Sequence, residues 1–139
     1  MRDVRDFDLI PGLGTADRTV PGGCSLCVLN GPGVGREWPL NQARMLLGRS
    51  DPPSVMVQID LTACELGVEP MISRRHAEVH WIEGRMYLVD LGSRNGTRIN
   101  GVALTPEEGA RISLPAALHP GDRIQLADLE LQFVCRGGV

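Results

Sequence analysis

The strongest constraint on the fold is the alternation of apolar and polar residues over short segments. In residues 129–135, LELQFVC, apolar side chains occupy every odd position, with Glu130 and Gln132 at the first two even positions between them. A period of two is typical of a β-strand that has one face on a core. This segment is therefore predicted to be the last strand of the fold.

Other segments show the same period. We expect Val55, Val57, Ile59 and Leu61 to share the core-facing side of one strand. In residues 77–81 we expect the apolar positions to face the core and Glu78 and His80 to face outward. In residues 86–89, Met86 and Leu88 lie opposite Tyr87 and Val89. A helical apolar stripe over ten residues is absent, and residues 106–110 form a single turn at most. The sequence therefore indicates an all-β fold.

Turn signals separate these segments. Glu83-Gly84 and Asn100-Gly101 each lie between two apolar runs, and Asn-Gly is a strong hairpin signal because a type I′ turn needs two residues with positive φ. Pro120-Gly121 marks a turn before the final pair of strands. Turns at intervals near ten residues favour a β-sandwich or barrel.

Length and charge limit the classes of function. A chain of 139 residues is most simply one domain, and a net charge of -3 gives no general attraction to nucleic acid. Since no apolar run is long enough to span a membrane and the start lacks the apolar core of a secretory signal, we expect a cytoplasmic protein. Residues 1–23 mix charges with proline and glycine, which predicts a flexible N-terminal tail before a domain at 24–136. Thr15 and Thr19 in this tail are candidate phosphorylation targets.

The chain has four cysteines: Cys24, Cys27, Cys64 and Cys135. A zinc site would need a second CxxC or a histidine pair near Cys24 and Cys27, and neither is present, so we expect no metal. The even count suggests disulfides mainly in short secreted chains. We therefore expect reduced, partly buried thiols, with a redox or metal-binding role as the alternative.

Three polar loops contain groups suited to an anion. Gly48-Arg49-Ser50 ends one apolar run, Ser73-Arg74-Arg75-His76 precedes another, and residues 93–101 read SRNGTRING. If strand connections bring these loops to one end of a sandwich, arginines, hydroxyls and amides assemble there. Arginine binds phosphate through charge-assisted bidentate hydrogen bonds, so this set suits a phosphate monoester.

The ordered set GRS, SRRH, RNGT and NG resembles the forkhead-associated (FHA) domain family over residues 24–136. The resemblance implies an eleven-stranded β-sandwich whose loops at one end bind phosphothreonine peptides. It implies no enzymatic activity and no cofactor. The expected partner is a phosphothreonine-containing protein, such as a Ser/Thr protein kinase or its substrate.

The resemblance also implies roles for individual residues. Arg49 would grip the phosphate, Ser73 would bond a phosphate oxygen, and Asn95 would hold the peptide main chain. The implied phosphopeptide-binding set is Arg49, Ser73, Arg74, Arg94 and Asn95. The implied supporting set is Gly48, His76, Gly96, Asn100 and Gly101. Met71, two residues before Ser73, would favour an apolar residue at the third position after the phosphothreonine.

Three alternatives remain open. The same fold could serve as a phospho-independent assembly domain that uses another face. Ser73 and His76 could be a nucleophile and its base, oriented by Asp60 or Asp90. A small barrel that binds oligonucleotides would need basic and aromatic faces, and Trp38 and Trp81 are too few and too separated to provide a stacking platform.

Overall fold

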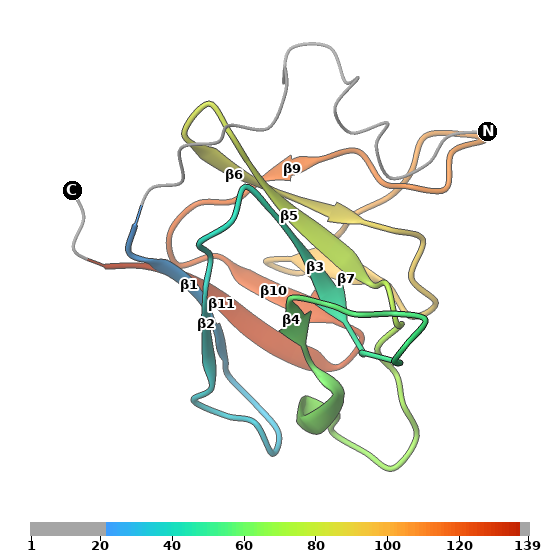
Figure 1. The fold of residues 1–139 in the computed structure, drawn as a ribbon. Helices are drawn as coiled ribbons and strands as arrows, with labels where there is room; N and C mark the ends of the chain where they lie inside the picture. Colours follow the sequence, from blue (N-terminus) through green and yellow to red (C-terminus); the bar gives the residue numbers. More distant parts are fainter. Residues whose placement is uncertain (1–21, 137–139) are drawn as a thin grey trace.

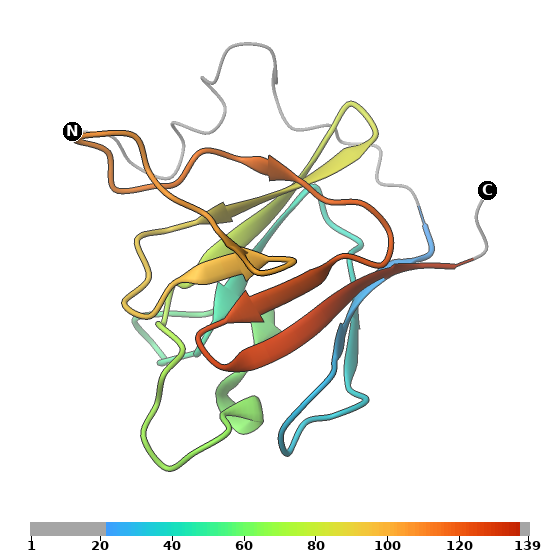
Figure 2. The same cartoon turned by 180° about the vertical axis from the view of Figure 1, so that it is seen from behind.

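A computed structural model describes residues 22–136 as two β-sheets packed face to face (Figures 1 and 2). The first sheet has the order β2-β1-β11-β10-β7-β8 and the second has the order β4-β3-β5-β6-β9. Eleven strands in two layers confirm the predicted all-β sandwich.

The strands are short, and three of the ten connections between consecutive strands are two-residue turns. The first sheet contains β1 (Cys24–Val28), β2 (Glu37–Pro39), β7 (Thr97–Ile99), β8 (Val102–Ala103), β10 (Arg123–Leu126) and β11 (Leu129–Cys135). The second contains β3 (Arg44–Gly48), β4 (Ile59–Asp60), β5 (Ala77–Ile82), β6 (Arg85–Asp90) and β9 (Ala116–Ala117). A 3-10 turn, η2 (Thr62–Cys64), follows β4, a helical turn that the sequence did not predict.

The main core lies between the two sheets. In β11 the side chains of Leu129, Leu131 and Phe133 are buried, whereas those between them are partly exposed, as the period of two predicted. Val79 and Trp81 of β5 reach the same core from the opposite sheet. Burial of about twenty side chains in this layer supplies the main driving force for folding.

The predicted turns are present where the sequence placed them. Glu83-Gly84 joins β5 to β6 and Asn100-Gly101 joins β7 to β8, and all four residues have positive φ. Gly121 also has positive φ, in the turn before β10. These turns set the register of the neighbouring strands.

The expectation for residues 55–61 is wrong. Val55 belongs to an isolated bridge with Asp51, and only Ile59 and Asp60 form a strand, which pairs in parallel with the end of β3. Ile59 lies in the main core, whereas Val57 packs against a separate apolar cluster on the other side of the sheet. The chain bends before Ile59, so the alternating positions do not share one face.

The expectation that Glu78 and His80 face solvent is also wrong. Every residue of β5 is buried, including Glu78 at 6% exposure and His80 at 0%. Nε2 of His80 lies 2.9 Å from Oε1 of Glu78, so these two atoms pair with each other away from water. An alternation of apolar and polar residues predicts which side chains of a strand share a face. It does not predict whether another segment covers that face.

The expectation of four reduced thiols is wrong for one pair. Cys24 and Cys135 form a disulfide between β1 and β11, with their Cα atoms 4.0 Å apart. They are 111 residues apart in sequence but lie opposite each other in the strand register, so only the fold brings them together. Cys27 and Cys64 are free, as expected for the remaining pair.

The predicted N-terminal tail, with Thr15 and Thr19, lies almost entirely outside the described residues. Within residues 22–136, no helix is long and apolar enough to cross a membrane. The same part of the chain contains no group of three His, Cys, Asp or Glu side chains that could hold a metal ion.

Candidate functional site

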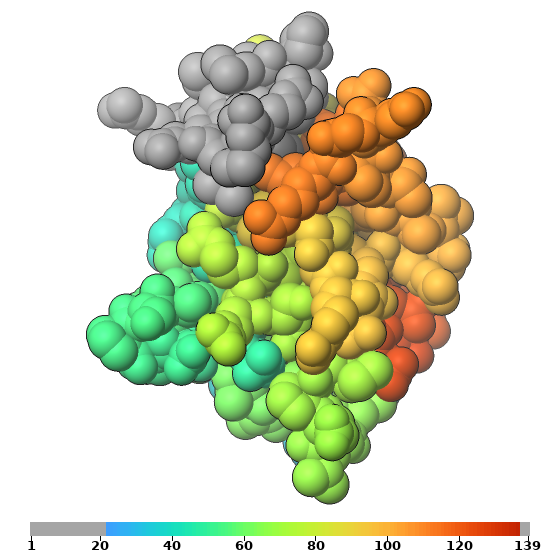
Figure 3. All heavy atoms as spheres, turned by 90° about the vertical axis from the view of Figure 1, so that its right-hand side faces the viewer, coloured from blue at the N-terminus to red at the C-terminus, as the bar shows by residue number. Residues whose placement is uncertain are grey.

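Three loops meet at one end of the sandwich. The first follows β3 at Arg49, the second precedes β5 at residues 71–76, and the third follows β6 at residues 92–96. The backbone N–H of Arg49 donates to the carbonyl of Arg74 at 3.2 Å, and the N–H of Arg94 donates to Oγ of Ser73 at 3.0 Å. The structure thus brings together the three loops that the sequence singled out, and Figure 3 shows the yellow-green second loop beside the yellow third loop.

Arg49 lies at the junction of the first two loops. Its Nε donates to the carbonyl of Ile72 at 2.5 Å and lies 3.8 Å from Oε2 of Glu65. About a quarter of the side chain is exposed. One edge of the guanidinium is therefore anchored to the protein, which preorganises the group for an anion.

Gly48 explains why the first loop can approach the second so closely. A Cβ atom at this position would lie 1.9 Å from the carbonyl oxygen of Arg74, a backbone atom that cannot move aside cheaply. Only glycine allows this contact. The supporting role expected for Gly48 thus has a direct steric basis.

His76 braces the second loop from inside. The N–H of Ser73 donates to Nδ1 of His76 at 3.0 Å, so Nε2 carries the proton and donates to the carbonyl of Gly96 at 2.9 Å. The side chain is fully buried, and burial lowers the pKa of His76 below its ordinary value. Both ring nitrogens are engaged by backbone groups, so neither is available to activate the hydroxyl of Ser73.

The remaining arginines form an exposed cationic rim. Nη1 of Arg74 lies 3.3 Å from a carboxylate oxygen of Asp51, and Nη2 of Arg94 donates to the carbonyl of Pro70 at 3.5 Å. Arg75 is exposed as well. Arg74 follows Ser73 in the chain and the backbone N–H of Arg94 donates to the Ser73 hydroxyl, so both arginines belong to loops that meet at Ser73.

Asn95 and Gly96 form the tip of the third loop. Nδ2 of Asn95 donates to the carbonyl of Met71 at 2.8 Å, which links the third loop to the second. Gly96 has a φ of 89°, which favours glycine, and its carbonyl receives the hydrogen bond from His76.

Asn100 and Gly101 lie at the other end of β7 from the loop that carries Arg94. Nδ2 of Asn100 donates to Oδ1 of Asp122 at 3.0 Å, and Oδ1 of Asn100 accepts from the N–H of Arg123 at 2.9 Å. These bonds fix the hairpin against the start of β10. Asn100 and Gly101 therefore support the site only indirectly, because they fix the position of β7, which begins where the third loop ends.

Asp90 is a supporting residue whose structural role the sequence did not reveal. Its carboxylate accepts hydrogen bonds from the N–H groups of Gly92 and Ser93 and from the hydroxyls of Ser93 and Thr97, at 2.5–3.0 Å. Asp90 thus shapes the whole third loop. One feature of the sequence could have identified this role: an aspartate at the end of an apolar strand, just before a Gly-Ser turn. A carboxylate at such a position often accepts hydrogen bonds from the backbone N–H groups of the turn.

Two further carboxylates, which the sequence also did not identify as supports, brace the other loops. Glu65 accepts from the N–H of Met71 and the N–H of Ile72, at 3.1 and 3.0 Å. Asp60 accepts from the N–H and hydroxyl of Thr62 and from the N–H of Ser50. Partial burial opposes ionisation of Asp60, but the hydrogen bonds from Thr62 and Ser50 outweigh it and lower the pKa of this carboxyl. Each loop is thus held by one buried or partly buried carboxylate.

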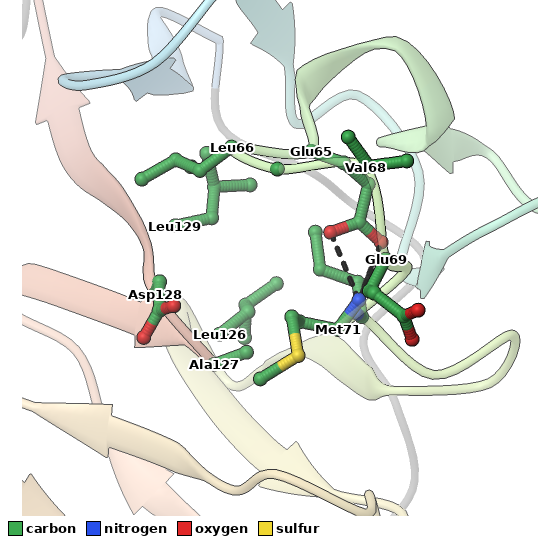
Figure 4. Close-up of a pocket in the computed structure, with 11 residues that line it drawn as sticks. Glu65, Leu66, Val68, Glu69, Met71, Leu126, Ala127, Asp128 and Leu129 are labelled. Carbon is green, nitrogen blue, oxygen red and sulfur yellow. Dashed lines mark hydrogen bonds between the residues drawn. The ribbon is translucent and has the colours of Figure 1, made fainter.

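A groove of about 250 Å³ lies beside the three loops, between residues 65–72 and the turn from β10 to β11. Its surface is apolar along Leu66, Ile72 and Leu129, and Met71 points across it toward Ala127 (Figure 4). The acidic side chains Glu65, Glu69 and Asp128 also line it. Asn95 of the third loop bonds to Met71, which lines the groove, so the groove borders the loops that carry the arginines.

A β-sandwich with a preformed cationic site on its end loops belongs to the class of anion-recognition modules. The model of the FHA domain family matches residues 45–127, which is more than half of the chain. The chain therefore belongs to the FHA domain family, as the motifs predicted.

Known relatives agree with this assignment. The chain is 32% identical over 134 residues to an oxoglutarate dehydrogenase inhibitor from Corynebacterium efficiens, covering 96% of this chain and 81% of that protein. It is also 32% identical over 114 residues to the glycogen accumulation regulator GarA from Mycobacterium tuberculosis, covering 82% of this chain and 59% of that protein. Among solved structures, an FHA domain studied for phosphothreonine-dependent interactions has 25% identity and a TM-score of 0.61, covering 82% of this chain and 97% of that one.

Proposed function

We propose that this chain is a phosphothreonine-dependent protein–protein interaction module in Ser/Thr-kinase signalling. The observation that best supports the proposal is that Arg49, Arg74 and Arg94 lie on three loops that backbone and Ser73 hydrogen bonds join at one end of the sandwich. The similar FHA domain whose interactions are phosphothreonine-dependent supports the same ligand. Arg49, Ser73, Arg74, Arg94 and Asn95 are the proposed contacts.

Electrostatics favours a phosphorylated ligand over an unmodified one. A phosphate monoester carries about -1.5 to -2 charges near neutral pH, so a cationic rim gains far more from it than from a free hydroxyl. Part of this attraction is exposed to solvent, so salt weakens binding. A single phosphopeptide contact of this kind corresponds to a Kd of about 1 μM, or about -8 kcal/mol.

The groove beside the loops extends the proposal to the peptide sequence. An apolar residue at the third position after the phosphothreonine packs against Met71, which is 37% exposed. The neighbouring carboxylates of Glu69 and Asp128 disfavour an acidic residue at that position. Discrimination against phosphoserine depends on one methyl group and amounts to about 1–3 kcal/mol.

A binding role fits the site better than catalysis. His76 uses both ring nitrogens on backbone groups, so a Ser73–His76 nucleophile pair is not formed. The relatives are named as an inhibitor and a regulator, which fits a partner that is a protein kinase or its substrate. We place the module in the cytoplasm, where the disulfide between Cys24 and Cys135 is an uncommon feature.

The test is a titration of the full chain with degenerate phosphothreonine, phosphoserine and unphosphorylated peptide libraries. We expect selective binding of phosphothreonine, which Arg49→Ala reduces at least tenfold while circular dichroism stays unchanged. Arg75→Ala is the matched control, because Arg75 is exposed beside the site and is not among the proposed contacts. It should bind like the wild type.

Two results would contradict the proposal. Equal phosphopeptide affinity of Arg49→Ala and the wild type would show that Arg49 does not bind the phosphate. Failure to bind any library would favour a phospho-independent assembly domain with the same fold.

A further inference from the structure

Arg74 differs from the other two arginines of the site, because a carboxylate holds one of its terminal nitrogens. Nη1 of Arg74 lies 3.3 Å from Oδ2 of Asp51. Arg94 contacts a backbone carbonyl, and Arg49 is held through Nε, at the inner end of its guanidinium. Arginine binds a phosphate best with two parallel N–H groups. Asp51 therefore occupies a part of Arg74 that a phosphate needs.

The backbone keeps Asp51 beside Arg74. The N–H of Asp51 donates to the carbonyl of Val55 at 2.7 Å, and the N–H of Val55 donates back to the carbonyl of Asp51 at 2.8 Å. The N–H of Arg49 donates to the carbonyl of Arg74 at 3.2 Å. These bonds tie the first loop to a closed turn on one side and to the second loop on the other. Neither partner of the ion pair depends on a ligand for its position.

The carboxylate of Asp51 is nevertheless exchangeable. The side chain of Asp51 is 51% exposed and that of Arg74 is 58% exposed, and an ion pair this exposed contributes little to stability. Among residues 22–136, Arg74 is the one partner of this carboxylate. Glu65 is different, since it is 12% exposed and accepts hydrogen bonds from two backbone N–H groups. Glu65 is a structural brace, whereas Asp51 is a counter-ion that a ligand can replace.

We propose that Asp51 competes with the ligand phosphate for Arg74 and thereby selects phosphothreonine peptides that carry a lysine or arginine beside the phosphothreonine. This inference rests on the proposed function, because it concerns the same site. A phosphate monoester has about -1.5 to -2 charges, more than a carboxylate, so it displaces Asp51 from Arg74.

The displaced carboxylate stays close to the phosphate, because the backbone of Asp51 is fixed. It repels the phosphate unless a cation of the ligand neutralises it. Glu69 and Asp128 add negative charge in the groove that borders the same loops. The ligand that complements this surface is a phosphate next to a basic side chain. A kinase that phosphorylates threonine within a basic segment supplies such a ligand.

The test is a calorimetric titration of the full chain with two phosphothreonine peptides, which have either alanine or lysine at the two positions next to the phosphothreonine. We expect the wild type to bind the lysine peptide about threefold more tightly, the factor typical of one exposed ion pair. Asp51→Asn should bind the alanine peptide about threefold more tightly than the wild type does and should lose most of the preference for lysine. The substitution keeps the shape of the side chain and both backbone bonds to Val55.

Two further variants separate competition for Arg74 from a general effect of charge. Glu83→Gln removes the same charge at the opposite end of β5, where Glu83 is exposed, and should bind both peptides like the wild type. In an Arg74→Ala background, Asp51→Asn should give less than half of its gain in affinity. The double-mutant comparison isolates the coupling between the two side chains. Circular dichroism verifies that each variant is folded.

Three results would overturn the inference. A wild type that binds phosphothreonine peptides no more weakly than Asp51→Asn would show that Asp51 positions Arg74 and does not compete for it. The same gain from Asp51→Asn with and without Arg74 would reduce its effect to charge alone. Equal affinity of the wild type for both peptides would remove the selection for a basic neighbour. In each case the wild type still binds phosphothreonine, whereas failure of the proposed function would abolish binding of both peptides.

Discussion

His76 shows how one buried side chain can hold two loops. It accepts a hydrogen bond from the backbone of Ser73 and donates one to the backbone of Gly96, which is possible only for the neutral ring. A proton added at Nδ1 would displace the N–H of Ser73 and place a charge in a buried position. The geometry of the second and third loops therefore depends on the protonation state of this residue.

We predict that the chain loses stability as the pH falls below about 6.5, the ordinary value for histidine. Because burial lowers the pKa of His76 in the folded state, the unfolded chain takes up the proton first, and the free energy of unfolding falls until the folded pKa is reached. The slope from this residue is at most about 1.4 kcal/mol per pH unit. Urea titrations between pH 7.5 and 5 measure it.

The control for this pH effect is His76→Asn, which removes the titrating group. Its free energy of unfolding should be lower than that of the wild type at pH 7.5, but should depend less on pH. A slope equal to that of the wild type would assign the effect to another group.

At the level of elements, each loop of the site is short and irregular, and a carboxylate organises its backbone N–H groups. Asp90 does so for the third loop and Glu65 for the second. The segment at residues 111–113 supports the third loop from behind, since the hydroxyl of Ser113 bonds to the N–H of Asp90. The site is therefore preorganised before any ligand arrives, which reduces the entropy cost of binding.

We predict that Glu65→Gln weakens phosphopeptide binding about fivefold. The substitution keeps the size of the side chain but weakens its bonds to Met71 and Ile72 and removes the charge near Arg49. A charged acceptor contributes about 1 kcal/mol more than a neutral one, which corresponds to this factor. Calorimetric titration with a phosphothreonine peptide measures it.

Glu69→Gln is the control for the second loop, because Glu69 lies in the same exposed segment and lines the groove. It should change affinity less than Glu65→Gln when the peptide has an alanine at the third position after the phosphothreonine. An equal effect of both substitutions would indicate that general charge, and not the brace, determines affinity.

At the scale of the whole molecule, the disulfide joins the first and last strands. Cys24 and Cys135 close a loop that contains almost the entire domain. The strands are already paired in the sheet, so the covalent link acts mainly on the unfolded chain.

We predict that Cys24→Ser lowers the free energy of unfolding by about 2–4 kcal/mol, with the chain-entropy value near 4.7 kcal/mol for a loop of about 100 residues as an upper bound. Urea unfolding without reductant measures the difference. Dithiothreitol should destabilise the wild type and leave Cys24→Ser unchanged. Cys27→Ser, at a free thiol, is the control, and a wild type insensitive to reductant would contradict the prediction.

Local patterns in the sequence were enough to predict most strands and turns. Period two identified β11 correctly, and the pairs Glu83-Gly84 and Asn100-Gly101 marked hairpins, because these signals depend on neighbouring residues alone. The three arginine-bearing loops were also recognisable as candidates from their residue types. Such signals depend only on neighbouring residues, so they can be recognised without knowledge of the fold.

What the sequence determined by itself was the class of fold, the turns and the residues available for an anion site. Only the tertiary structure decided that Cys24 meets Cys135, that both faces of β5 are buried, and that Asp90 and Glu65 organise the loops. The first two depend on which segments the sandwich places together across long separations in the chain. The carboxylate braces depend on the exact path of each loop, because a hydrogen bond requires its donor and acceptor to lie within about 3 Å.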